Sequence, residues 1–227
     1  MRALLPAYVV SAVLAIAAAP WALDQPLLAW LFKPLTTALV VVHAWQRGRP
    51  GDAQRRALLV GLAMSWLGDV ALLWPQGFVT GLVAFLLAHL AYGVAFTRRV
   101  RLAARWSPFA LYALVAGSVA AWVWPGVPPA LRLPVLAYVA CLGAMAAQAA
   151  VQWRVLREGA AADGGLTRQP RLAAWAALGG ALFVLSDALL AINRFREPLP
   201  LSGLWILSSY WAAQWCIASS LAPRRSA

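Results

Sequence analysis

The sequence is poor in charged residues. They make up 11% of its 227 residues, whereas 63% are hydrophobic and 13 are Trp. With a mean hydropathy of +0.73, the chain has too little polar surface to cover a water-soluble core. This composition excludes a soluble globular enzyme and predicts a membrane protein, with no soluble domain anywhere along the chain.

Cysteine and histidine are also scarce, with two of each. Cys141 and Cys216 lie in apolar stretches, so the sequence has neither a disulfide framework nor a CxxC metal or redox motif. A three-histidine zinc site cannot be assembled from His43 and His89. No metal and no cofactor are therefore predicted.

Acidic residues number seven against 19 basic ones, which gives a net charge of +12. A basic chain can bind nucleic acid, but here the basic residues form short clusters between apolar stretches rather than one continuous face. Membrane topology explains them better, because cytoplasmic loops of membrane proteins are enriched in Lys and Arg. We therefore predict membrane lipids as partners and no nucleic acid.

Apolar stretches long enough to cross about 30 Å of hydrocarbon can be drawn eight times. They lie at residues 3–22, 27–46, 57–74, 77–97, 106–124, 131–153, 172–192 and 202–222. The sequence thus predicts an all-α, polytopic membrane protein, a bundle of eight transmembrane helices that forms a single transmembrane domain over residues 1–227. Close contacts between helices are predicted at Gly61, Gly68, Gly179 and Gly180.

Arginines mark the two sides of this bundle. One set of connections holds three, Arg132, Arg194 and Arg196. The alternate set holds fifteen, which are Arg2, Arg47, Arg49, Arg55, Arg56, Arg98, Arg99, Arg101, Arg105, Arg154, Arg157, Arg168, Arg171, Arg224 and Arg225. The positive-inside rule then predicts both termini in the cytoplasm. Abundant Ala and Arg are typical of a GC-rich bacterial genome, so we expect a bacterial inner (plasma) membrane.

The N-terminal stretch has an alternative interpretation. Arg2, the apolar residues after it and the small-residue string at 15–22 resemble a secretory signal with a cleavage site. Cleavage there would leave the sidedness of the other helices unchanged.

Two aspartates lie inside apolar stretches, Asp69 in "SWLGDVALLW" and Asp187 in "FVLSDALLAI". A charge at the bilayer centre costs on the order of 2.5–3.5 kcal/mol, so intramembrane acids are candidates for function. Asp69 lies about 8 Å before Trp74 and Asp187 about 10 Å before Arg194, both on the outer side. Lys33, the single lysine, lies at that level too. This shared depth predicts one pocket in the outer half of the membrane.

Other polar side chains are predicted to line this pocket and bind substrate together with Lys33. They are His89, Tyr92, Tyr138, Asn193, Tyr210 and Gln214. His89 and Tyr92 share a helix face with Phe85, and Tyr210 and Gln214 share another. Two alternatives remain: these groups join helices by hydrogen bonds, and Lys33 forms a structural pair with one aspartate.

Two carboxylates at one depth suit acid–base chemistry. One acid gives a proton, and the other, ionised beside a cation, activates water. Intramembrane acids also serve as proton relays, so a small-molecule or proton-coupled transporter is an alternative. A non-catalytic lipid-binding protein is another. The sequence has no internal repeat and no paired Gly/Pro-interrupted helices of the kind that build transporter sites.

Five segments resemble the successive motifs of the YhhN family of membrane proteins, which includes animal lysoplasmalogenases. They are "KPLTT" at 33–37, "SWLGDVALL" at 65–73, "GLVAFLLAHLAY" at 81–92, "GGALFVLSDALLAINRF" at 179–195 and "YWAAQWCIASS" at 210–220. Between residues 98 and 170 the likeness is confined to hydropathy. By this resemblance Asp69 and Asp187 match the family's catalytic acids, and Lys33 matches its Lys-Pro motif.

The resemblance implies an eight-helix membrane hydrolase. Its substrate would be a lysophospholipid, lysoplasmalogen, whose vinyl ether is cleaved to a fatty aldehyde and glycerophosphoethanolamine or glycerophosphocholine. Protonation of the outer alkene carbon gives an oxocarbenium ion, water adds to it, and the hemiacetal collapses. This chemistry needs a protonated acid and a carboxylate, as glycoside hydrolysis does. Which aspartate is the donor stays open, and so does a different ether lipid as the physiological substrate.

Overall fold

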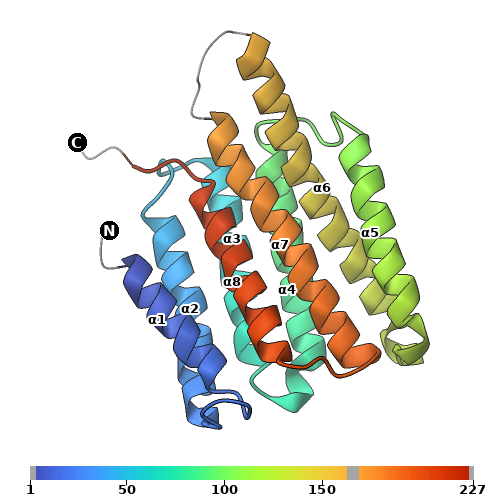
Figure 1. Cartoon of the computed structure of the whole chain (residues 1–227). Coiled ribbons are helices and arrows are strands. Elements are labelled where there is room, and N and C mark those ends of the chain that lie inside the picture. Colours follow the sequence, from blue (N-terminus) through green and yellow to red (C-terminus); the bar gives the residue numbers. More distant parts are fainter. Residues whose placement is uncertain (1–3, 163–168, 225–227) are drawn as a thin grey trace.

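The computed structural model describes residues 4–162 and 169–224, and this part of the chain is built from α-helices (Figure 1). The predicted helices are confirmed as α1 (Leu4–Ala17), α2 (Pro26–Trp45), α3 (Ala53–Ala71), α4 (Phe78–Thr97), α5 (Ser107–Val123), α6 (Arg132–Ala162), α7 (Gln169–Phe195) and α8 (Ser202–Ser219). Three short 3-10 turns, η1 (Pro75–Gly77), η2 (Trp124–Gly126) and η3 (Pro129–Leu131), lie in the connections. Arg2, Arg168 and Arg225, which entered the prediction of sidedness, lie outside the described residues.

Three helix ends differ from the prediction by four residues or more. Helix α1 ends at Ala17 rather than at 22, because the chain turns before Pro20 and the Leu23 amide donates to the Ala17 carbonyl at 2.9 Å. Helix α3 begins at Ala53, where the Asp52 side chain caps it by accepting from the Gln54 amide at 2.8 Å. Helix α6 continues to Ala162, since its polar last turns are good helix formers that hydropathy does not detect.

Five helices in the described part are long and apolar enough to cross a membrane, and they are α2, α4, α5, α6 and α7. Helix α1 has 14 residues, a length of about 21 Å, and α3 carries Arg55 and Arg56 in its first turn. Large apolar side chains such as Leu27, Leu114 and Leu133 lie exposed on the outside of the bundle. An apolar exterior is what lipid requires. The chain is therefore an integral membrane protein.

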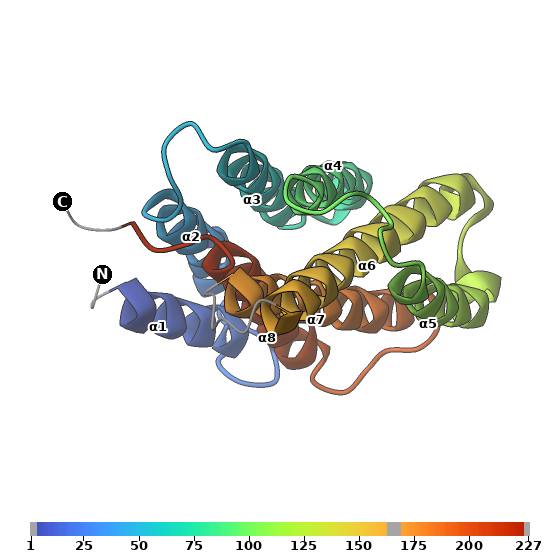
Figure 2. The same cartoon turned by 90° about the horizontal axis from the view of Figure 1, so that it is seen from above.

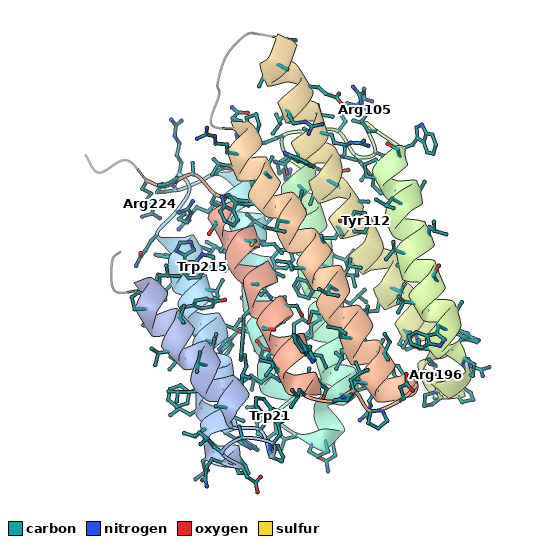
Figure 3. The ribbon with its side chains drawn as sticks, viewed as in Figure 1. Trp21, Arg105, Tyr112, Arg196, Trp215 and Arg224 are labelled. Atoms are coloured by element: carbon teal, nitrogen blue, oxygen red, sulfur yellow. The ribbon has the colours of Figure 1, made fainter. Side chains whose placement is uncertain are left out.

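Six helices form a closed ring in which α2, α3, α4, α6, α7 and α8 each pack against the next, and α8 returns to α2. Helix α1 lies outside the ring against α2 and α8, and α5 lies outside it against α6 and α7 (Figure 2). The two predicted sides are the two ends of the bundle: Arg105 and Arg224 lie at one end, and Trp21 and Arg196 at the other (Figure 3). We call these the arginine-rich and the arginine-poor end.

Glycines bring the ring helices together, as the sequence predicts. A Cβ atom on Gly61 would lie 2.3 Å from Cε1 of Tyr92, and one on Gly180 would lie 3.0 Å from the Ala146 Cα. Gly68 and Gly179 face Phe85 and Ile217 in the same way. The α3–α4, α6–α7 and α7–α8 contacts therefore depend on the absence of a side chain at these positions.

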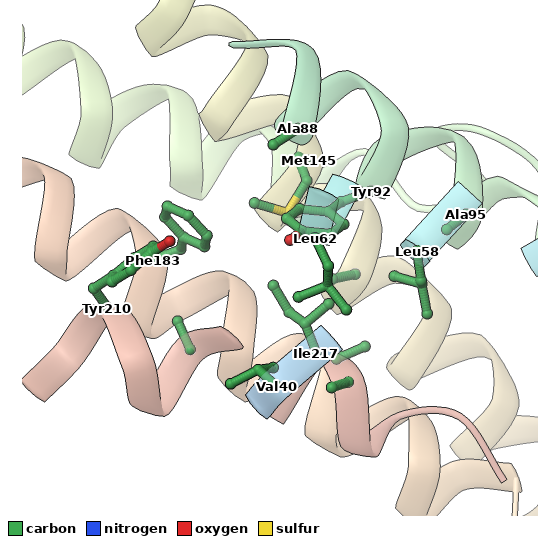
Figure 4. Close-up of a cluster of buried hydrophobic side chains, with 14 of the residues drawn as sticks. Val40, Leu58, Leu62, Ala88, Tyr92, Ala95, Met145, Phe183, Tyr210 and Ile217 are labelled. Carbon is green, nitrogen blue, oxygen red and sulfur yellow. The ribbon is translucent and has the colours of Figure 1, made fainter. Parts of the chain in front are cut away.

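The interior of the ring changes character along its length. Toward the arginine-rich end it is filled by aliphatic side chains such as Leu58, Leu62 and Ile217 (Figure 4). Toward the other end Phe183 packs edge-on against Tyr210, with ring centres 5.5 Å apart. The buried polar residues of the candidate site surround these two rings.

Candidate functional site

Asp69 is buried where three helices meet. Its side chain on α3 is 1% exposed, and its Oδ2 atom accepts hydrogen bonds from Thr37 on α2 at 2.5 Å and Tyr210 on α8 at 2.7 Å. The Trp211 indole donates to the Thr37 hydroxyl at 3.1 Å. Hydrogen bonds donated to a carboxyl group favour its ionised form.

A chain of hydrogen bonds continues from this aspartate toward α4. The Gln214 amide nitrogen donates to the Tyr210 hydroxyl at 3.2 Å, and the Tyr92 hydroxyl donates to the Gln214 amide oxygen at 2.7 Å. Ser65 lies 3.2 Å from the same Tyr92 oxygen. Tyr92, Tyr210 and Gln214, all predicted as pocket residues, are thus joined to Asp69 in one network.

Lys33 lies close enough to Asp69 for an electrostatic interaction between their charges. The salt bridges in the described part of the chain, Arg99–Asp52 and Arg105–Glu158, do not include this pair. Pro34 follows Lys33 within α2. Lys33 and Asp69 are therefore neighbours that form no contact ion pair.

Asp187 has different surroundings. Its Oδ2 atom accepts one hydrogen bond, from the Tyr138 hydroxyl on α6 at 2.5 Å. The carboxyl also lines a partly open cavity of about 90 Å³ among α4, α5, α6 and α7. The wall of this cavity is apolar except at Tyr138, Asp187 and Arg194. An apolar group in this cavity would therefore contact Asp187 with few other polar side chains around it.

The two acids are separated by aromatic rings. Phe85 lines the cavity, and its ring centre lies 5.7 Å from that of Tyr210, the donor to Asp69. Within the described residues no hydrogen bond or ion pair joins Asp69 to Asp187. The single pocket expected from their depth is thus divided: Asp187 faces the cavity, and Asp69 lies one layer of side chains behind its wall.

His89 lies between the two groups. Its side chain is fully buried, and its ring is edge-on to Tyr138 and Phe183, with centres 5.1 and 4.6 Å away. Neither ring nitrogen has a hydrogen-bond partner in the described part of the chain. A buried polar atom without a partner is costly and marks a position for water or substrate.

Asn193 lies apart from the other candidates at the end of α7. Its side-chain oxygen accepts a hydrogen bond from the Leu199 amide at 2.9 Å, which holds the connection to α8. It does not line the Asp187 cavity.

Sequence reasoning missed three residues of this site. Thr37, one turn after Lys33 in "KPLTT", shares its helix face, and this spacing could have identified it. Trp211 follows no pattern, because most Trp residues in such a chain anchor it at the interface. Arg194 counts in the sequence as an outer-side charge, and its place on the cavity wall depends on how α7 is rotated. The described residues contain no group of three His, Cys, Asp or Glu side chains that could hold a metal ion.

The chain is thus an all-helical integral membrane protein with one buried acid, Asp69, and one partly buried acid, Asp187, that faces an apolar cavity. The model of the YhhN family matches residues 28–221, so the chain belongs to the YhhN family. No solved structure matches the chain.

Curated relatives carry the name lysoplasmalogenase. Human "Lysoplasmalogenase TMEM86B" is 35% identical over 176 residues, which are 75% of this chain and 66% of the relative. Bovine "Lysoplasmalogenase TMEM86A" is 35% identical over 74% of this chain and 66% of its own length. A "Lysoplasmalogenase" of Mycobacterium bovis is 33% identical over 85% of this chain and 68% of its own length. The chain thus spans just under two thirds of the first two relatives and slightly more of the third.

Proposed function

We propose that this protein hydrolyses the vinyl ether bond of lysoplasmalogen, releasing a fatty aldehyde and glycerophosphoethanolamine or glycerophosphocholine. The observation that carries the proposal is a carboxyl group, Asp187, on the wall of an apolar cavity inside a membrane-embedded bundle. The names of the relatives support the same activity. A substrate with one hydrocarbon chain explains why the acid lies among apolar side chains.

Asp187 is the proton donor in this proposal. Its carboxyl has one hydrogen-bond partner and faces the cavity, so a proton can pass directly to the outer alkene carbon of the substrate. The π electrons of the alkene form the new carbon–hydrogen bond. The positive charge that results is shared between the other alkene carbon and the ether oxygen. The Asp187 carboxylate left behind stabilises this oxocarbenium ion.

Hydrolysis then restores the acid. Water adds to the cationic carbon, and one of its protons passes to the Asp187 carboxylate. The product of this step is a hemiacetal. The hemiacetal carbon–oxygen bond breaks as the hydroxyl loses its proton, giving the aldehyde, while the glycerol oxygen gains a proton. Tyr138 positions Asp187 through the 2.5 Å hydrogen bond.

Asp69 is proposed to act as a fixed negative charge behind the cavity wall. It is held by Thr37 and Tyr210, and Lys33 lies near it. Its field favours a cation in the cavity, because charges interact more strongly in a low dielectric than in water. The substrate-binding roles of Lys33, His89, Tyr92, Asn193, Tyr210 and Gln214 stay predictions, and the hydrogen bonds of Tyr92, Tyr210 and Gln214 also suit a supporting network.

The finer topology belongs to the same proposal. Eight spans in one transmembrane domain and both termini in the cytoplasm are supported by the arginines at alternate helix ends, the side that Arg105 and Arg224 mark in Figure 3. A bacterial inner membrane is supported by the mycobacterial relative. Helix α1 packs on α2 with Ser11 and Thr36 hydrogen-bonded at 2.7 Å, as expected of a retained helix rather than a removed signal.

Purified protein in detergent provides the test. We expect fatty aldehyde from lysoplasmalogen and no release of fatty acid from an ester-linked lysophospholipid. Asp187→Asn should lower kcat by about 10²- to 10⁴-fold, the usual contribution of a general acid, with Glu197→Gln, an exposed acid, as the matched control. Full aldehyde release by a folded Asp187→Asn protein would contradict the mechanism.

A further inference from the structure

Arg194 lies on the same cavity wall as Asp187. It follows Asp187 on α7 by seven residues, so the two share one face of the helix about 10 Å apart. Its guanidinium lies over the Phe78 ring, 4.8 Å from the ring centre, at the arginine-poor end of the bundle. The cavity therefore has a cation at one end and an acid further in.

The wall beyond Asp187 is hydrocarbon. Val184 on α7, Leu142 on α6 and Ala116 on α5 line it on the side away from Arg194. Along the cavity a positive charge is thus followed by a carboxyl group and then by a purely apolar stretch. A lysophospholipid has the same order of groups: phosphate, glycerol with its ether, and hydrocarbon chain.

The Arg194 guanidinium is available for an anion. The salt bridges of the described residues leave it out, and Asp187 is bound by Tyr138 instead. The contact with Phe78 uses none of the N–H donors of the guanidinium in a hydrogen bond within the described residues, so donors remain for an anion. Arginine binds phosphate through paired N–H donors.

We propose that Arg194 binds the phosphate of the substrate and thereby sets the depth at which the vinyl ether meets Asp187. This inference rests on the proposed function. With the phosphate held at the end of α7, the glycerol spans the interval to Asp187 and the chain lies along Val184 and Leu142. Substrate enters from the arginine-poor end.

Head-group selectivity follows from the same geometry. Asp187 is the one acidic residue on the cavity wall within the described part of the chain, and it lies further in than Arg194. No carboxylate on this wall is placed to bind the ammonium of ethanolamine or choline. Phosphate recognition should therefore make the two head groups similar substrates.

Two substrates with the same vinyl ether isolate the role of Arg194: lysoplasmalogen, and an alkenylglycerol that lacks the phosphate. Arg194→Gln should raise KM for lysoplasmalogen about 10- to 100-fold, as expected for a lost charged hydrogen bond, with kcat little changed. Its kcat/KM for alkenylglycerol should equal that of wild type, and Arg194→Lys should recover part of the loss. Arg196→Gln is the matched control, because Arg196 is exposed nearby and does not line the cavity.

Equal losses on both substrates, or no loss on lysoplasmalogen, would overturn the inference. A second measurement separates it from the proposed function: a lysophospholipid with a saturated alkyl ether cannot be cleaved this way but should still raise the Tm of wild type, and much less that of Arg194→Gln. If wild type released no aldehyde from lysoplasmalogen, the proposed function would be refuted. Equal Tm shifts in both proteins would refute the phosphate site.

Discussion

At the scale of single residues, two aspartates in similar helices have unlike environments. Asp69 has two hydrogen-bond donors and a nearby lysine, whereas Asp187 has one donor and an apolar cavity. The proposed roles of Asp69 as a fixed charge and Asp187 as a proton donor rest on these partners rather than on the residue type.

Thr37 tests the support of Asp69. Thr37→Val removes a donor to Asp69 and leaves the buried Trp211 indole without its acceptor, so we expect about 1–3 kcal/mol lower stability and reduced kcat. Thr36→Val is the matched control, because Thr36 is equally buried but bonds to Ser11 and Phe32. Thermal unfolding in detergent and aldehyde release measure both effects. Equal activity in the two variants would mean that Thr37 does not serve the site.

A substitution of His89 distinguishes a packing role of this residue from a functional one. If its unpartnered ring nitrogens merely fill space, His89→Leu should keep activity and raise stability by about 1–3 kcal/mol, because an unsatisfied buried group is removed. We expect instead that Tm is maintained or raised while kcat falls, as for a group that holds water or substrate beside Tyr138. Unchanged kcat would assign His89 to the core.

At the scale of helices, close packing positions the hydrogen-bond network. Gly61 on α3 lies under the Tyr92 ring of α4, and the Tyr92 hydroxyl links Ser65 to Gln214. The contact therefore fixes both the helix spacing and the orientation of a polar side chain.

Gly61→Ala tests this coupling. The added methyl group would lie 2.3 Å from Tyr92 Cε1, so the ring must move and its hydrogen bonds must break, and we expect a loss of about 1–3 kcal/mol. Gly93→Ala on α4 is the control, because nothing lies within 4 Å of its added Cβ and alanine favours the helix. Tm in detergent distinguishes them, and equal Tm values would show that α3 and α4 can separate without cost.

At the scale of the whole molecule, charge and cavity lie at opposite ends. Most arginines lie at the helix ends of the arginine-rich end, while the Asp187 cavity, with Arg194, lies toward the other. The proposed topology turns the cavity toward the outer leaflet.

Labelling of single cysteines tests this orientation. In a background with Cys141 and Cys216 replaced, Arg196→Cys should react with a membrane-impermeant maleimide added to intact cells, and Arg49→Cys should react after lysis alone. Both positions are exposed. The reverse pattern would invert the topology, and labelling of both from outside would contradict the span count.

Hydropathy and charge act locally along the chain, so the sequence alone predicts the class of protein and the approximate positions of the helices, and it shows how rare the acids are. It also identified the glycines of the helix contacts. The direction of each side chain depends on the tertiary structure, because helices at one level of the membrane can point their side chains in different directions. The rotation of α3 turns Asp69 toward Thr37 and Tyr210, while that of α7 aligns Asp187 and Arg194 along one apolar cavity.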